Sequence, residues 1–136
     1  MVSNDVMESS TSKYFSNLPV YQKAMEIFSL SRRISDYISE GKSTFKLADD
    51  NQVCYAGDII TYSSKLAPSI KAAESHTNRI SRYKHVLLLK KFTHRLTRQC
   101  ERLERQTVDG KDYVGMLHTE LKKFKRLQLS WEASLK

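Results

Sequence analysis

Six basic residues in the second half of the chain fall on one side of a predicted helix, with a spacing suited to a polyanion. At about 100° per residue, side chains three, four and seven positions apart point in similar directions. This set, called the cationic row below, consists of Lys84, Lys91, Arg95, Arg98, Arg102 and Arg105. At 1.5 Å per residue the row would extend about 31 Å, and a polyphosphate presents charges repeatedly along such a length. The spacing therefore predicts a phosphate-binding helix face.

The cationic row belongs to the stretch that holds most of the protein's net charge. Residues 76–106 contain nine Lys or Arg, Arg79 and Arg82 among them, against Glu101 and Glu104, and so carry +7 of the formal +8. Like charges three or four positions apart each destabilise a helix by roughly 0.2–0.5 kcal/mol, and no carboxylate lies on that stripe. A pI of about 9.5 with the charge packed into one segment favours a nucleic-acid partner. The alternative is a solvated helix face, because charge runs usually lie in water.

The opposite side of the same helix is apolar. Its stripe comprises Leu89, Phe92, Leu96, Cys100 and Leu103, which predicts one face in a core and the other in water. The two cysteines, Cys54 and Cys100, stand in apolar stripes and form no CxxC pair. We therefore expect buried, reduced thiols and no disulfide or zinc site.

One spacing admits an enzyme. Arg79 and His85 form an Arg-x5-His pattern that is similar to the motif of the all-helical HEPN-type ribonucleases. There the arginine and histidine of two subunits act on an RNA 2'-hydroxyl and phosphate by general acid-base chemistry. Here Ile80 stands where a polar residue is usual after the arginine, and such a spacing arises readily in a segment dense in Arg and His. A ribonuclease using this pair is the alternative function, and the leading prediction is a protein without enzymatic activity.

The other histidines predict no site. His76, His85 and His94 recur every nine residues, which alternates them across a helix and predicts no shared metal. His118 has no carboxylate or thiol neighbour in sequence, so we assign it no role. Gly-rich phosphate loops and paired-cysteine spacings are also missing from the sequence. We predict no metal and no cofactor.

Hydrophobic periodicity predicts four amphipathic helices. The first begins near residue 17 and ends at Gly41, the second is capped by Asp49 or Asp50, the third spans about 78–106, and Asp109–Gly110 marks the turn into the fourth. Their inner lines include Val20, Ala24, Ile27, Ser31, Ile34 and Ile38; Val53, Ala56, Ile60, Ser63, Ala67 and Ile70; and Val114, Leu117, Leu121, Phe124, Trp131 and Leu135. Because proline removes a backbone donor and clashes with the preceding turn, the second helix should kink near Pro68 or break at Ala67.

These elements predict an all-α protein, an antiparallel up-down four-helix bundle formed by residues 17–136 behind a flexible tail, 1–16. We expect a core that includes Phe28, Ile60, Leu96, Phe124 and Trp131. No apolar run is long enough for a membrane span and the N-terminus lacks signal-peptide features, so a cytoplasmic protein without membrane attachment is expected. On the last helix, Lys122, Lys123 and Arg126 point outward and would extend the basic surface.

Two segments resemble a known family. Residues 18–35 (LPVYQKAMEIFSLSRRIS), with Tyr21, Gln22, Lys23, Ala24 and Glu26, are similar to the first helix of the small four-helix proteins named after intervening sequences of 23S ribosomal RNA. Ala73-Glu74-Ser75 resembles that family's Ala-Glu-Gly at the end of its second helix. The unusually basic third helix is more similar to one branch, the accessory variability proteins of diversity-generating retroelements.

That resemblance implies pentameric, ring-like assemblies that bind a reverse transcriptase and its template RNA. For this chain it implies a homo-oligomeric accessory protein that presents cationic helices to RNA or DNA and transfers no catalytic residue. From charge alone, the expected nucleic-acid-binding residues are the cationic row with Arg79, Arg82, Lys122, Lys123 and Arg126. A third possibility is a structural bundle whose basic face docks an acidic protein partner.

Overall fold

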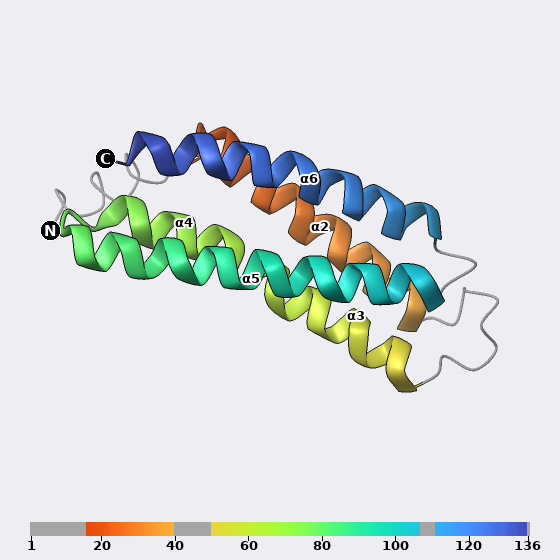
Figure 1. The fold of residues 1–136 in the computed structure, drawn as a ribbon. Helices are drawn as coiled ribbons and strands as arrows, with labels where there is room; N and C mark the ends of the chain where they lie inside the picture. Colours follow the sequence, from red (N-terminus) through yellow and green to blue (C-terminus); the bar gives the residue numbers. More distant parts are fainter. Residues whose placement is uncertain (1–15, 40–49, 107–110, 136) are drawn as a thin grey trace, which may run out of the picture.

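The computed structural model describes residues 16–39, 50–106 and 111–135, and all regular structure within these ranges is helical. The helices are α2 (Pro19–Ser39), α3 (Asp50–Ser63), α4 (Leu66–Ser75), α5 (Arg79–Gln106) and α6 (Lys111–Ser134) (Figure 1). The predicted all-α class is confirmed. The predictions for residues 1–15, for Gly41 and for Asp109–Gly110 lie outside the described residues, as do those for the side chains of Val53 and Cys54.

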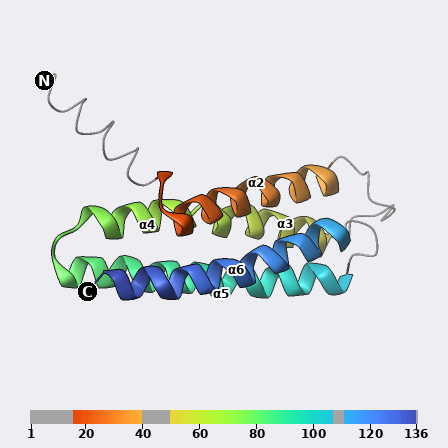
Figure 2. The same ribbon diagram turned by 90° about the horizontal axis from the view of Figure 1, so that it is seen from above.

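The helices form an elongated bundle in which α3 and α4 together take the place of one predicted helix. Helix α5 packs against α3 and α4 on one flank and α6 on the other, and α2 completes the bundle against α3, α4 and α6 (Figures 1 and 2). Along the α5–α6 seam, Lys90 contacts Glu132 and Glu104 contacts His118. Between these two contacts, residue numbers therefore rise along α5 as they fall along α6.

The long helix α5 begins where its sequence favours a start. The side-chain oxygen of Asn78 accepts a hydrogen bond of 2.8 Å from the Ile80 N–H, the arrangement of an N-cap residue. The side chain thereby satisfies one of the backbone donors that have no partner inside the helix. The observed start at Arg79 lies one residue from the predicted start.

The second predicted helix breaks three residues earlier than expected. Helix α3 ends at Ser63 and α4 begins at Leu66, so Pro68 is the third residue of α4. A proline is compatible with the first turn of a helix because its missing N–H would have no intrahelical partner there. The break falls instead at Ser64 and Lys65, where the Lys65 N–H donates to the Tyr62 carbonyl at 3.1 Å.

The core follows the predicted apolar stripes closely. Leu89, Leu96, Cys100 and Leu103 on α5 are fully buried, as are Leu117, Leu121 and Phe124 on α6. Two of the predicted inner residues are serines, Ser31 and Ser63, and both are buried. The Ser31 hydroxyl donates to the Ile27 carbonyl at 2.8 Å, which meets the cost of burying a polar group.

Of the five residues expected in or near the core, Leu96, Phe124 and Trp131 are buried, whereas Phe28 and Ile60 are only partly buried. On α3, Ile59 is fully buried beside the partly buried Ile60, while the predicted inner residues Ala56 and Ser63 are buried as expected. Adjacent residues on a helix point about 100° apart, so Ile59 and Ile60 cannot both point directly into the core.

Candidate nucleic-acid interface

The cationic row lies on the outer face of α5. All six members are exposed, on the side of the helix opposite buried Leu89, Leu96 and Leu103. Among the described residues, none of the six side chains makes an ion pair with a carboxylate. The six charges that the helical wheel predicted on one face therefore lie together on that face, exposed to water.

Three members of the row have weak local contacts that leave their charge available. Arg95 lies over the ring of Tyr62, with 6.0 Å from the guanidinium carbon to the ring centroid. Arg102 donates to the Gln99 side chain and Arg105 to the Glu101 carbonyl, both at 3.4 Å. Since no carboxylate is involved, these contacts orient the guanidinium groups without neutralising them.

Arg82 differs from the rest of the predicted set because its guanidinium serves the fold. Its Nε donates to the His76 carbonyl at 2.6 Å and its Nη1 donates to the Leu135 carbonyl at 3.1 Å. These bonds join the turn before α5 to the end of α6. Arg82 therefore has a structural role in the fold, and its part in nucleic-acid binding stays a prediction. Arg79 is exposed and lines a cleft between α5 and α6.

The cations of α6 divide into two groups. Lys122 and Arg126 are exposed without a carboxylate partner among the described residues, as is Lys125, which the sequence analysis did not select. Lys123 is different, because its Nζ lies 3.2 Å from Glu120. In the sequence, the basic run KKFKR at 122–126 could have indicated that Lys125 belongs to the same surface. The Lys90–Glu132 and Glu104–His118 contacts bracket this run, so it lies along the same length of α5 as Lys91, Arg98 and Arg102.

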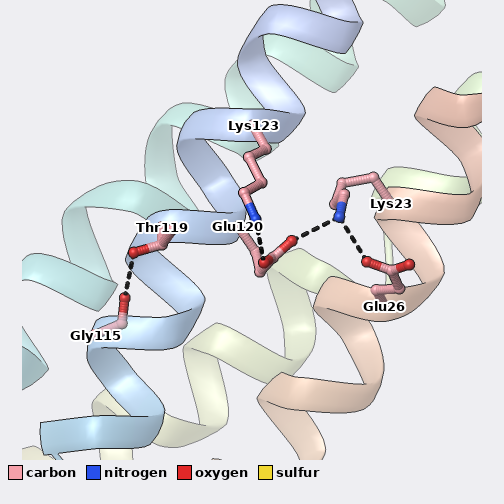
Figure 3. A network of polar contacts seen from close by, with 6 residues as sticks. All are labelled: Lys23, Glu26, Gly115, Thr119, Glu120 and Lys123. Carbon is pink, nitrogen blue, oxygen red and sulfur yellow. Dashed lines mark hydrogen bonds and ion pairs between the residues drawn. The ribbon is translucent and has the colours of Figure 1, made fainter.

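The seam between α2 and α6 shows the opposite electrostatic arrangement (Figure 3). The Lys23 ammonium donates to Glu120 at 2.6 Å and to Glu26 at 2.7 Å, while Lys123 approaches the other oxygen of Glu120. Hydrogen bonds to Glu120 and Glu26 raise the pKa of Lys23, and the bond from Lys23 lowers the pKa of Glu120. Both shifts stabilise the charged forms, so carboxylates neutralise the cations at this seam.

The histidine pair His76 and His85 corrects another expectation. Their rings lie 4.9 Å apart between centroids, although the nine-residue spacing predicted separation. The prediction placed both on one helix, whereas His76 follows the end of α4 and precedes α5. Within the described residues no group of three metal-ligating side chains occurs.

The geometry of one chain does not unite the predicted ribonuclease pair. Arg79 lines the cleft toward α6, while His85 packs against His76 at the turn from α4. Positions six residues apart in a helix point about 120° away from each other. A site made of both residues would therefore require a second subunit.

His118 has a partner that the sequence did not reveal, whereas Cys100 is buried and free, as the sequence predicted. His118 Nδ1 lies 3.0 Å from Glu104, a contact between helices that only the packing of α5 on α6 creates. Burial raises the pKa of the Cys100 thiol to about 12, with Glu104 and Glu101 adding to the shift. At neutral pH this thiol stays protonated, so Cys100 is a core residue and not a nucleophile.

Comparison of the chain with family models, with curated proteins and with solved structures finds no match. Several residues that carry the family resemblance nonetheless have clear structural roles. Ala24 is fully buried, Lys23 and Glu26 belong to the α2–α6 seam, and Glu74 accepts a 2.7 Å hydrogen bond from the Trp131 indole. In the part of the chain that the structure describes, no helix has both the length and the apolar character needed to cross a membrane.

Proposed function

We propose that this protein is a non-catalytic accessory protein that binds nucleic acid through the outer face of α5. The observation that carries the proposal is the exposure of all six cations of the cationic row with no carboxylate partner among the described residues. Phosphates at intervals along a strand would replace the missing partners.

The use of carboxylates elsewhere favours a functional origin for this surface. At the α2–α6 seam, Glu120 and Glu26 surround Lys23. On α5 the row retains mutual repulsion, which costs stability. A solvated face needs no such concentration of one sign, whereas a phosphate-binding face does.

The α6 run at 122–126 supports the proposal as a second, smaller source of charge. Lys122, Lys125 and Arg126 are exposed, and the two seam contacts set them along the middle of α5. Lys123 contributes less because Glu120 holds its ammonium group. We therefore place the centre of the interface near Arg98 and give Lys125 the role predicted for Lys123.

Contacts of this kind are directed at phosphates, so affinity should vary little with base sequence. By the family resemblance, the partner nucleic acid is the template RNA of a retroelement, and the protein assists its reverse transcriptase in the cytoplasm. The same resemblance places antiparallel up-down bundles in a pentameric ring. Such a closed homo-oligomer would set several copies of α5 side by side and multiply the binding charge.

The decisive experiment measures binding of labelled RNA and duplex DNA at several salt concentrations. If each subunit neutralises about six phosphates, log K against log salt should have a slope near −5 for duplex DNA and a shallower one for single strands. Changing Arg95, Arg98 and Arg102 together to Gln should bring the duplex slope to about −2.7 and weaken binding to all sequences alike.

A control variant of equal net charge separates position from total charge. Arg32, Arg33 and Lys71 are exposed cations on α2 and α4, and their joint change to Gln should leave the slope near the wild-type value. If the α5 triple variant binds as tightly as wild type at moderate salt, the row is a solvated face and the proposal is wrong. Cleavage of the RNA during incubation, lost in Arg79→Ala and His85→Ala, would support the ribonuclease instead.

A further inference from the structure

An open cleft of about 430 Å³ lies where the beginning of α5 meets the end of α6. Its lining is mainly apolar and includes Tyr83, Val86, Leu129 and Leu135, with Arg79 and Lys90 among the polar residues. Val86 belongs to the buried core, and Leu135 is partly buried against that core. Tyr83 and Leu129 are exposed, so the bundle leaves apolar surface open in this cleft, called the α5–α6 cleft below.

Both walls of the cleft carry apolar side chains. On α5, Tyr83 and Val86 stand three residues apart and line the cleft, and 62% of the Tyr83 surface is exposed. Across the cleft, Leu129 is 66% exposed. Apolar side chains at i and i+3 along one helix, facing apolar residues on a neighbour, make a groove for a third helix.

The charge around the cleft indicates which helix would fit. The first twelve residues of α5 contain four cations and no carboxylate, and the positive end of the helix dipole adds to their potential. The one carboxylate in the lining, Glu132, lies 3.4 Å from Lys90 and is already paired. A segment that combines apolar residues with flanking Asp or Glu therefore complements both features of the surface.

We propose that the α5–α6 cleft is a docking site for an acidic amphipathic helix of a protein partner. The partner's apolar residues, at i, i+3, i+4 and i+7, would cover Tyr83, Val86 and Leu129. Its carboxylates would meet Arg79, an exposed cation of the cleft lining.

The alternative occupants fit less well. A second copy of this chain pairing through the same face would bring like-charged α5 segments together. Among the side chains that the structure describes, the exposed carboxylates are Glu26 and Asp36, which stand ten residues apart on α2, about 15 Å along its axis, and so form no compact acidic patch. Nucleic acid would use Tyr83 for stacking but would gain little from the aliphatic residues beside it.

The test uses the full-length protein and a fluorescein-labelled synthetic helix with Leu at i, i+3, i+4 and i+7 and Glu on both flanks. Anisotropy should show saturable binding, with affinity at least about tenfold weaker for a peptide with Lys in place of Glu and for a scrambled sequence. The double variant Tyr83→Ser, Leu129→Ser should lose binding by a similar factor. Both side chains are exposed, so the fold should survive, as circular dichroism would verify.

Met116 supplies the matched control, because it is an apolar residue of α6 with 54% exposure that does not line the cleft. Met116→Ser should bind the peptide like wild type. Equal binding by the double variant would overturn the proposal. A double variant that turns an oligomer into monomers would assign the cleft to a second copy, and weaker RNA binding by that variant would assign it to nucleic acid; either outcome also overturns the proposal.

The two proposals fail separately. The triple variant of Arg95, Arg98 and Arg102 alters only the later part of α5, so it should retain peptide binding while binding nucleic acid more weakly. Loss of peptide binding in that variant would show that net charge, and not the cleft, attracts the peptide, and would overturn the docking site alone.

Discussion

The α2–α6 seam and the outer face of α5 treat the same kinds of side chain in opposite ways. At the seam, Lys23 lies between Glu120 and Glu26, and the pKa shifts of Lys23 and Glu120 favour their charged forms (Figure 3). On the outer face, cations follow one another without a carboxylate partner among the described residues. The chain therefore contains carboxylates that pair with cations, but within the described residues none of them forms an ion pair with the cationic row.

This difference separates charges that stabilise the fold from charges that remain available. Paired, partly buried ions fix the approach of two helices, as the contact from Lys23 to Glu120 does across 97 positions of sequence. Exposed like charges on one helix weaken it slightly and create a field that extends about a Debye length into solution. Four experiments test this difference between the two regions.

The largest expected effect lies inside α5. Leu96 is fully buried, so Leu96→Ala should lower the free energy of unfolding by about 2–5 kcal/mol through lost burial and a new cavity. Arg98→Ala, two residues away on the outer face, should leave it nearly unchanged or raise it by at most about 1 kcal/mol. Urea unfolding measures both. Equal losses at the two positions would contradict the assignment of inner and outer faces.

The next effect concerns the seam. Glu120→Gln removes the carboxylate shared by Lys23 and Lys123 and should cost about 0.5–1.5 kcal/mol, because Lys23 is only 19% exposed and keeps Glu26 alone. Glu26→Gln is the matched control: Glu26 is 60% exposed, so its loss should be smaller. A greater loss of stability in Glu26→Gln would show that Glu26, and not Glu120, is the stronger partner of Lys23.

The pH dependence should follow from the same two groups. The folded-state pKa of Glu120 lies below its ordinary 4.5, so the stabilisation is present above that value and is lost as the pH falls through the lower folded pKa. The folded-state pKa of Lys23 lies above 10.5, so its contribution is complete below 10.5 and is lost as the pH rises through the raised value. Wild type should exceed Glu120→Gln in stability between these limits, and urea midpoints across pH measure the difference. A gap that persists at pH 2 would exclude the ion pair as its cause.

The smallest effect belongs to the cationic row. Arg98→Gln removes the like-charge pairs with Arg95 and Arg102, so it should raise stability by roughly 0.2–0.5 kcal/mol for each pair at low salt. In 1 M salt the Debye length is about 3 Å and this gain should vanish. Thermal unfolding at both ionic strengths measures the gain. An unchanged difference in high salt would mean that helix propensity, not repulsion, is responsible.

The helices and most of their buried stripes could be predicted from the sequence alone. The start of α5 at Arg79, the burial of Leu96 and Phe124 and the exposure of the cationic row all follow from the 3.6-residue period, which is a local property of the chain. The expectations about nucleic acid, the oligomer and the retroelement partner remain predictions. They concern molecules other than this chain.

Which helices pack against each other, and which side chains interact between them, can be seen only in the tertiary structure. Glu104 with His118, Glu74 with Trp131 and Arg82 with the Leu135 carbonyl each join positions far apart in the sequence. The docking of α6 on α5 also leaves Tyr83 and Leu129 uncovered at one end of the seam. A helical wheel assigns directions within one helix but not the neighbour that a direction meets, so the partners of Glu104 and Glu74, the contacts of Arg82 and the open cleft depend on packing between helices.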